Sequence, residues 1–261
     1  MTPSRRSRID PFIVMDVMER AARAERAGRH IIHMEVGQPG TPAPRAALRA
    51  LARAMDADPL GYTVALGLPA LRERIAELYR QWYDIEVPPE RVIVTAGSSA
   101  GFVLAFTALF DAGQRVAIAE PGYPSYRQIL RALDLEPVGI QTRPENRYQP
   151  VPAEIEAIAD LQGLLVASPA NPTGTMLDRD ALGALIETAQ ARGITFISDE
   201  IYHGIQYERR AVSALEISDQ VIVINSFSKY FSMTGWRVGW MVVPEEMVRP
   251  IERLAQNLFI C

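Results

Sequence analysis

The sequence predicts a three-layer α/β/α fold in which helices cover both faces of a mostly parallel, seven-stranded sheet. Two patterns indicate it. From Arg91 onwards, short apolar runs alternate with longer segments of helical periodicity, as in parallel sheets wrapped by helices. Clusters of polar residues directly follow several of these runs, where open sheets of this class bind ligands. With 48% hydrophobic residues, a chain of 261 residues can also bury the large core that this fold needs.

The N-terminal part of the chain is predicted to be mainly helical. Ile9 to Gly28 has apolar residues at helical spacing, and its terminal glycine is expected to end that helix. Ile31 to Val36 reads as a short strand. Pro44 to Ala57 and Leu68 to Trp82 are two further helices.

The rest of the chain supplies the predicted sheet. The seven expected strands are Val92–Thr95, Val116–Ala119, Val138–Gln141, Leu164–Ala167, Thr195–Ser198, Val221–Asn225 and Arg237–Val243. The helices expected to follow strands are Ser98–Phe110, Ser125–Leu133, Ala153–Ala159, Asp180–Arg192 and a last one beginning near Pro244. No repeat or low-complexity linker interrupts this order.

Composition excludes several classes of protein. The net charge of −4 is small and its signs are mixed along the chain, so no basic face for nucleic acid is expected. The one cysteine, Cys261, cannot form a disulfide framework or a zinc cluster within the chain. The apolar run Pro11 to Met15 is too short for a signal peptide, and the longer runs are interrupted before they could span a membrane. We therefore expect a soluble, cytoplasmic protein that binds neither nucleic acid nor membrane.

Lys229 is the only lysine of the chain, although Lys and Arg together number 27. A preference for arginine explains the other basic residues but not this exception. Unlike a guanidinium, a primary amine can lose its proton near neutral pH and form an imine with an aldehyde. Lys229 also follows a buried strand, which is an unusual place for an ordinary surface lysine.

Five residues form a predicted phosphate site. Ser98 and Ser99 open a helix, whose first backbone N–H groups can bind an anion. Ser226, Ser228 and Arg237 offer hydroxyls and a bidentate guanidinium to the same kind of anion. For the serines alone, helix capping explains the pattern equally well. Because the nucleotide-binding motifs GxGxxG and GxxxxGK are absent, a phosphate monoester is the expected ligand.

Four other residues could surround an aromatic ring. Asp199, at the end of a strand, needs a partner such as a protonated ring nitrogen. Tyr202 and Asn171 could bond a phenolic oxygen, and Tyr123 could stack on the ring. Taken singly, these residues also fit a loop cap, packing or a turn. Taken together with Lys229, they describe a pyridine ring that bears a phosphate, a hydroxyl and an aldehyde.

Several motifs resemble those of one enzyme family, over essentially the whole chain and in the same order. They are VGQPG, GYT followed by GLPALRERIA, VTAGSSAG, EPGYPSY, SPANPTG, DEIY and SFSKYFSMTGWRVGW. In these motifs the chain resembles the fold-type I pyridoxal-phosphate (PLP) enzymes, specifically the class I/II aminotransferases. The resemblance implies a PLP-transferase-like large domain that moves an amino group between an amino acid and a 2-oxo acid.

The resemblance also implies roles for these residues. Lys229 would form a Schiff base with the cofactor, the internal aldimine, and later move the substrate proton. Asp199 would pair with the pyridinium, and Gly37 and Asn171 would lie near the substrate. Tyr202 and Asn171 would bond the ring oxygen of the cofactor, and Tyr123 would lie on the ring face. The implied phosphate ligands are Ser98, Ser99, Ser226, Ser228 and Arg237. Tyr62 would reach the phosphate of the partner subunit in a homodimer.

The resemblance predicts that residues 1–40 accompany a small C-terminal domain and that residues 41–261 form the large PLP-binding domain. Relatives continue beyond the position of Cys261, so the chain is expected to be truncated and its activity impaired. Two alternatives use the same scaffold: a carbon–sulfur β-lyase and a non-catalytic PLP-binding regulatory domain. No DNA-binding segment precedes residue 9, which counts against the regulator.

The sequence disfavours two other kinds of site, a metal site and a serine hydrolase site. His203 follows two acidic residues, but His30 and His33 lie far away in sequence, so no metal is expected. A serine hydrolase is disfavoured because the GxSxG motif is absent.

Overall fold

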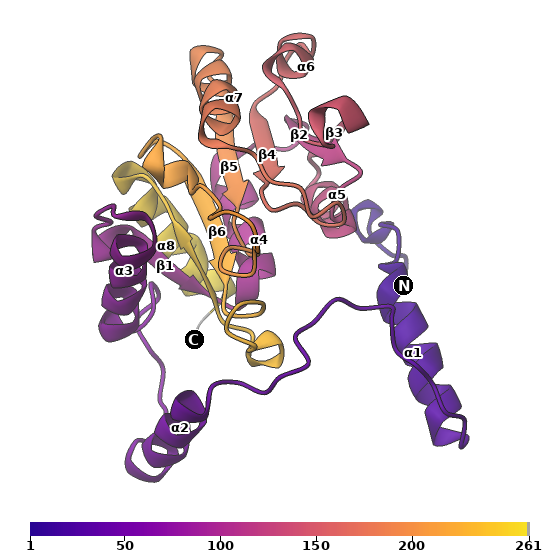
Figure 1. The fold of residues 1–261 in the computed structure, drawn as a ribbon, viewed down its shortest axis with the longest axis vertical. Coiled ribbons are helices and arrows are strands. Elements are labelled where there is room, and N and C mark those ends of the chain that lie inside the picture. The colour runs from indigo at the N-terminus through magenta and orange to yellow at the C-terminus, as the bar shows by residue number, and fades with distance from the viewer. Residues whose placement is uncertain (260–261) are drawn as a thin grey trace.

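The computed structural model describes residues 1–259, and the single cysteine at position 261 lies outside them. Within this range seven strands form one sheet in the order β1-β7-β6-β5-β4-β2-β3 (Figure 1). Every neighbouring pair is parallel except the two that β7 makes with β1 and β6. The strands are β1 (Val92–Thr95), β2 (Arg115–Glu120), β3 (Glu136–Gln141), β4 (Gly163–Ala167), β5 (Thr195–Asp199), β6 (Ile222–Ser226) and β7 (Gly239–Val242).

Helices cover both faces of this sheet, which confirms the predicted three-layer α/β/α fold. The helices are α1 (Ile13–Arg26), α2 (Arg45–Ala57), α3 (Pro69–Tyr83), α4 (Gly97–Leu109), α5 (Pro124–Ala132), α6 (Pro152–Glu156), α7 (Arg179–Ala191) and α8 (Glu245–Leu258). One apolar core contains residues of α3, α6 and α7, and a second contains residues of α4, α5 and α8. Strand side chains alternate between the two cores, as Val223 and Ile224 of β6 do.

The topology brings the predicted site residues to one edge of the sheet. Strands β1, β2, β4, β5 and β6 all run in the same direction, so their carboxyl ends lie on the same side. Strand β7 runs in the opposite direction and therefore begins at this edge. Arg237, predicted as the first residue of that strand, instead lies before it, in a left-handed turn with φ of 54°.

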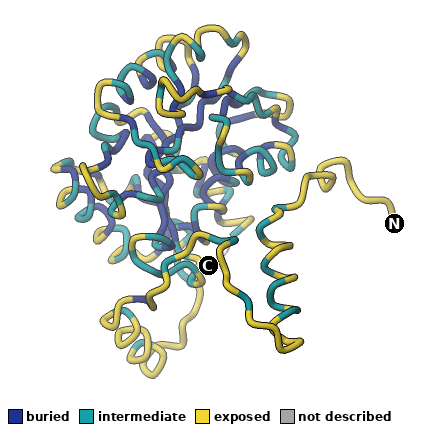
Figure 2. Tube along the Cα trace, turned by 45° about the vertical axis from the view of Figure 1, so that its right-hand side comes forward, coloured by how far each residue is buried: buried dark blue, intermediate teal, exposed yellow. Residues whose placement is uncertain are grey.

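Helices α1 and α2 lie apart from the sheet and contain no buried residue (Figures 1 and 2). Two predictions in this region are wrong. The first helix begins at Ile13 and not at Ile9, because Pro11 disfavours helical backbone at Asp10. Residues 31–36 form no strand: they have no partner strand, and Ile32 and Met34 are exposed.

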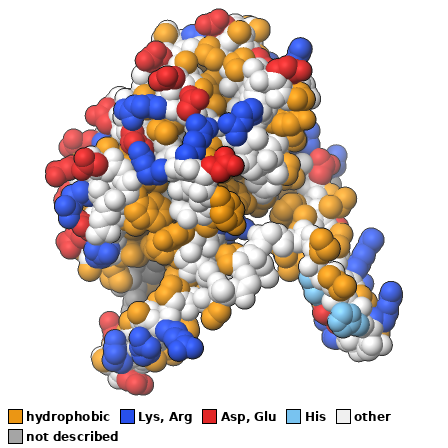
Figure 3. All heavy atoms as spheres, in the orientation of Figure 1, with side chains coloured by type: hydrophobic (Ala, Val, Ile, Leu, Met, Phe, Trp, Pro, Cys, Tyr) orange, Lys and Arg blue, Asp and Glu red, His pale blue; other side chains and the backbone are white. Residues whose placement is uncertain are grey.

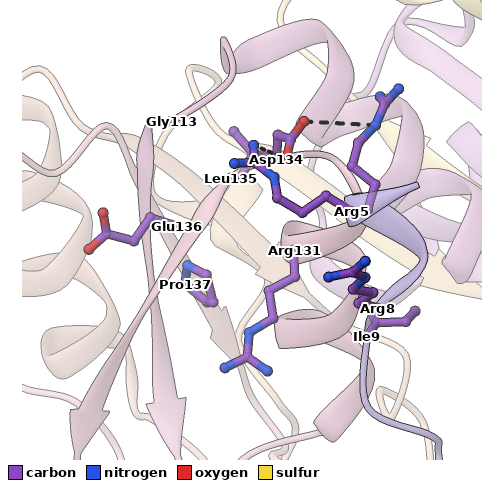
Figure 4. A pocket seen from close by; sticks show the side chains of 10 residues that line it. Arg5, Arg8, Ile9, Gly113, Arg131, Asp134, Leu135, Glu136 and Pro137 are labelled. Atoms are coloured by element: carbon purple, nitrogen blue, oxygen red, sulfur yellow. Dashed lines mark hydrogen bonds and ion pairs between the residues drawn. The ribbon is translucent and has the colours of Figure 1, made fainter. Parts of the chain in front are cut away.

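The N-terminal segment contacts the body of the protein through polar pairs at α5 and β3. Arg5 donates to Asp134 at 3.2 Å, and Arg131 pairs with Asp10 at 2.9 Å. A cavity of about 470 Å³ lies here, with several arginines on its wall (Figure 4). Because these carboxylates already partner Arg5 and Arg131, the pairs serve to hold the segment in place.

The surface shows no concentration of one charge on the face drawn in Figure 3, where acidic and basic side chains are interspersed. Helix α2 presents arginines beside apolar side chains. In the described part of the chain, no helix combines the length and the apolar character needed to cross a bilayer.

Candidate active site

A cavity of about 440 Å³ opens at the carboxyl edge of the sheet, which is the expected place for a ligand in this fold. Its wall includes seven of the residues singled out from the sequence: Gly37, Ser98, Tyr123, Asn171, Asp199, Tyr202 and Lys229. The rest of the wall is largely apolar and comes from the segment around α1, from α4 and α5, and from the loop after β5. Residues far apart in the sequence therefore meet at one cavity.

Lys229 brings the only lysine amine to this cavity. It lies in the loop after β6, and its Nζ donates a hydrogen bond to the carbonyl oxygen of Gly37 at 2.6 Å. The same nitrogen lies 5.6 Å from the centre of the Tyr202 ring. Partial burial lowers the pKa of Lys229.

Asp199 places a carboxylate at the base of the cavity, where it is only 3% exposed. One oxygen accepts the backbone N–H of Ile201 at 3.0 Å, and the other accepts the hydroxyl of Tyr126. Burial raises the pKa of Asp199 to about 6, although both hydrogen bonds act in the opposite direction. A cationic ligand beside this carboxylate would stabilise its charged form.

Asn171 and Tyr202 meet on another wall of the cavity. The amide nitrogen of Asn171 donates to the hydroxyl oxygen of Tyr202 at 3.3 Å. Because that hydroxyl accepts from Asn171, its own hydrogen is available to a ligand oxygen. Tyr123 lies nearby, with its ring held edge-on between Phe12 and Tyr126.

The predicted phosphate residues gather where α4 begins. Gly97 has φ of +77°, and a Cβ there would collide with the Arg237 guanidinium. Arg237 therefore lies directly against the first turn of α4, beside Ser98. This geometry combines a guanidinium with the free N–H groups of a helix N-terminus, and both favour an anion.

Ser226 and Ser228 are both buried next to this turn. The Ser226 hydroxyl donates to the carbonyl of Val238 at 3.0 Å and accepts the N–H of Ser228 at 3.1 Å. The two hydroxyl oxygens are 2.7 Å apart. Since Val238 takes the hydrogen of Ser226, Ser228 donates its hydroxyl to the Ser226 oxygen.

Five predicted residues do not line this cavity. Three of them, Ser226, Ser228 and Arg237, lie next to the first turn of α4, and the other two lie elsewhere. The Ser99 side chain lines a separate groove between the N-terminal segment and helices α4 and α5, although its backbone belongs to the first turn of α4. Tyr62 is 87% exposed in the loop between α2 and α3. The structure of one chain therefore leaves both roles as predictions.

Sequence reasoning missed Tyr126 and Phe12, which also line the cavity. Tyr126 belongs to the EPGYPSY motif and lies three residues after Tyr123, so the two side chains share one side of α5. That spacing could have identified it. Phe12 offers no local signal, because its position depends on how the N-terminal segment packs.

His203, weighed as a metal ligand, has a different use. Its Nε2 donates to the carbonyl oxygen of Ser168 at 2.8 Å, and its Nδ1 accepts the hydroxyl of Tyr83 at 2.6 Å. Burial lowers the pKa of His203 to about 4, so the ring is neutral at pH 7. Among residues 1–259, no three side chains of the types His, Cys, Asp and Glu are grouped to hold a metal ion.

The comparison with known families decides the classification. Residues 29–261 match the model of aminotransferase class I and II. The chain belongs to this family. Valine–pyruvate aminotransferase of Mycobacterium tuberculosis is 46% identical over 260 residues, which cover 98% of this chain and 67% of that protein.

Solved structures agree with this classification. A structure from Silicibacter pomeroyi is 67% identical, with a TM-score of 0.92 over 100% of this chain and 68% of its own. Aspartate aminotransferase of Thermus thermophilus, solved with maleate, is 30% identical and has a TM-score of 0.95. The match covers 100% of this chain and 69% of that structure's chain. The chain spans about two thirds of the length of the curated relatives that it matches most strongly.

Class I and II aminotransferases are PLP enzymes that move amino groups between amino acids and 2-oxo acids, which confirms the predicted cofactor and reaction class. The cavity fits PLP on structural grounds of its own. It offers a partly buried amine for the aldehyde, a buried carboxylate for a ring cation, and a helix N-terminus for the phosphate. Its volume lies within the range of small-ligand sites.

Gly239 lies at the start of β7, against the first turn of α4. A Cβ there would lie 2.8 Å from the Asn225 carbonyl oxygen and 2.9 Å from the backbone nitrogen of Ser98. Since neither backbone atom can move aside easily, Gly239→Ala should lower the free energy of unfolding by about 1–3 kcal/mol, measured by urea denaturation. As a control, Gly183→Ala in α7 meets nothing within 4 Å and should be neutral or stabilising. Equal stability of the Gly239 variant and the wild type would contradict this packing.

Proposed function

We propose that this chain binds PLP as a Schiff base on Lys229 and transfers the amino group of an apolar amino acid to a 2-oxo acid. The observation that supports this most strongly is the position of the only lysine. Its amine has a lowered pKa and faces the same cavity as the buried carboxylate of Asp199. When bound, PLP supplies an aldehyde for this amine and a ring that draws electrons from the substrate α-carbon.

Three side chains orient the ring in this proposal. Asp199 pairs with the ring nitrogen and keeps it protonated. Tyr202 donates to the ring oxygen, supported by the Asn171 amide that already bonds its hydroxyl. Tyr123 contacts the ring face from the first turn of α5. With PLP bound, the Lys229 amine would be the base that holds or moves the proton of the substrate.

Five residues bind the phosphate in this proposal. Arg237 supplies the charge, and its contact with Gly97 places the guanidinium at the N-terminus of α4. Ser98 and Ser99 contribute the first turn of that helix. Ser228 turns its hydroxyl from the Ser226 oxygen to the phosphate, and Ser226 fixes the turn in which both serines lie.

The proposed substrate class follows from the cavity wall. Phe12, Val14 and Val36 make one side of the wall apolar, and no arginine lines it among the described residues. A second carboxylate on the substrate would find no arginine here and would meet the carboxylate of Glu35, whereas a branched aliphatic side chain would find contacts. This agrees with the valine and pyruvate in the name of the relative that is 46% identical. Gly37 and Asn171 border the space for the substrate carboxylate.

We further propose a homodimer in which Tyr62 reaches the phosphate of the partner subunit. Its high exposure in this chain supports that role, as do the exposed apolar side chains around it on α2 and the following loop: Leu48, Leu51, Met55, Leu60 and Val64. We propose that residues 1–40 form a separate segment that accompanies a small C-terminal domain, with Phe12 and Gly37 lining one wall of the cavity. Residues 41–261 then form the PLP-binding domain.

The test is an amino-transfer assay on the chain loaded with PLP. Valine and pyruvate should give alanine, and omitting pyruvate should stop the reaction after one turnover. Release of ammonia and pyruvate from a thioether amino acid, without a 2-oxo acid, would instead indicate a carbon–sulfur β-lyase. Binding of PLP without either reaction would indicate a regulatory domain, and both of these outcomes would contradict the proposed transamination.

A further inference from the structure

The hydroxyl of Tyr126 is the feature of the cavity that the assignments above leave unused. Tyr126 lies in α5, is 4% exposed, and donates its hydroxyl to the carboxylate oxygen Oδ2 of Asp199. The other oxygen of Asp199 accepts the Ile201 N–H. Each oxygen therefore has one protein donor. Because a carboxylate can accept about four hydrogen bonds, room remains for a ring N–H.

The ring of Tyr126 is fixed by its neighbours. Its centroid lies 5.1 Å from that of Phe102 and 5.3 Å from that of Tyr123, both in edge-on geometry. Phe102 belongs to α4 and Tyr123 directly precedes α5, so the two helices hold the phenol between them. Burial and the charge of Asp199 raise the pKa of Tyr126 well above its ordinary value. The hydroxyl consequently stays protonated and always donates.

We propose that Tyr126 is a positioning residue for the reaction: its hydroxyl holds Asp199 in the orientation and the ionised form that a protonated ring nitrogen requires. This inference rests on the proposed function, since it assumes that Asp199 faces the ring of PLP. Burial alone favours the neutral carboxylic acid, and a donor to the carboxylate favours the anion. The Tyr126 hydroxyl thus opposes the effect of burial at the Asp199 carboxylate, which lines the cavity.

The other groups around Asp199 do not replace this donor. Glu200, the next residue, is a buried acid whose charge disfavours a second anion. Tyr202 and Tyr123 share the cavity, but Tyr202 is bonded to Asn171 and neither has a hydrogen bond to Asp199 among the described contacts. Lys229 also lines the cavity and donates to Gly37. Removing the Tyr126 hydroxyl therefore leaves Asp199 with the Ile201 N–H alone.

The test compares Tyr126→Phe with a matched loss of a buried hydroxyl, Tyr79→Phe. Tyr79 is 1% exposed in α3 on the opposite face of the sheet, where its hydroxyl accepts the indole N–H of Trp240. In the chain without cofactor, the Asp199 carboxyl is titrated by ¹³C NMR. Tyr126→Phe should make this carboxyl a roughly tenfold weaker acid. Tyr79→Phe should leave its titration unchanged.

A second readout uses the chain loaded with PLP that is ¹⁵N-labelled in the ring. The ring nitrogen should be protonated at pH 7.5 in the wild type and in Tyr79→Phe, and largely neutral in Tyr126→Phe. If Tyr126→Phe does not fold, 3-fluorotyrosine at position 126 keeps the hydroxyl and strengthens it as a donor. In the same ¹³C NMR titration, 3-fluorotyrosine at position 126 should make the Asp199 carboxyl a stronger acid than in the wild type.

The outcomes separate this inference from the proposed function. If PLP does not attach to Lys229 in the wild type, the proposed function fails and the role of Tyr126 in the reaction fails with it. If PLP attaches and the Tyr126 variants titrate like the wild type, with the ring nitrogen still protonated, the proposed function stands and only the role of Tyr126 is overturned.

Discussion

Lys229→Ala is expected to abolish the visible absorbance of bound PLP and to lower amino transfer by at least roughly 10²–10⁴-fold. The variant lacks the only side-chain amine of the chain, so no other lysine can take over the bond to the aldehyde. It also lacks the group that moves the substrate proton. Absorbance spectra and the valine–pyruvate assay measure the two losses separately.

Lys229→Arg is the matched control for this result. Arginine keeps the positive charge and most of the length, but a guanidinium does not lose its proton near neutral pH. This variant should still bind PLP through the phosphate site, without a covalent bond. Retention of both the bound-cofactor absorbance and activity in Lys229→Ala would show that another group holds the cofactor.

Asp199→Ala is expected to weaken PLP binding by about 2–5 kcal/mol, or roughly 30- to 4,000-fold, because a buried ring cation loses its counter-charge. Equilibrium dialysis measures the affinity for PLP. Asp178→Ala is the control, since Asp178 caps the N-terminus of α7 and lies outside the cavity wall. Unchanged PLP affinity in the Asp199 variant would contradict the ring pairing.

The same substitution should have the opposite effect on the stability of the cofactor-free chain. Burial raises the pKa of Asp199 from 3.8 to about 6, so between these pH values the folded chain binds more protons than the unfolded chain. Ionising Asp199 therefore destabilises the native state by about 3 kcal/mol, an effect that develops from about one pH unit below the unfolded pKa to about one unit above the folded pKa. In urea denaturation, the stability difference between Asp199→Ala and wild type should shift in favour of the variant by about this amount from pH 4 to pH 7.

The arrangement of the site could be predicted because its residues follow strands. Asp199 ends one parallel strand and Lys229 follows another, and the carboxyl ends of parallel strands meet at one edge. The sequence pattern that locates the strands therefore also locates these side chains. Arg237, also predicted at the phosphate, joins them from the turn before β7, and the antiparallel direction of that strand was not predicted from the sequence pattern.

What could not be predicted depends on packing between distant segments. Phe12 reaches the cavity because the N-terminal segment is tied to α5 through Asp10 and Arg131, a pair separated by more than a hundred positions. Residues 31–36 have the composition of a strand, but no strand lies beside them to accept their hydrogen bonds. Such contacts leave no periodic signal in the sequence.

The most direct test of the whole account is to incubate the 261-residue chain with PLP, reduce it with borohydride, and identify the labelled peptide by mass spectrometry. Because the chain has one lysine, the only competing amine is the N-terminus. We predict one reduced pyridoxyl-phosphate group per chain, on the peptide that contains Lys229. Label on the N-terminal peptide alone, or an unmodified Lys229 at saturating PLP, would contradict the assignment of this cavity as the PLP site.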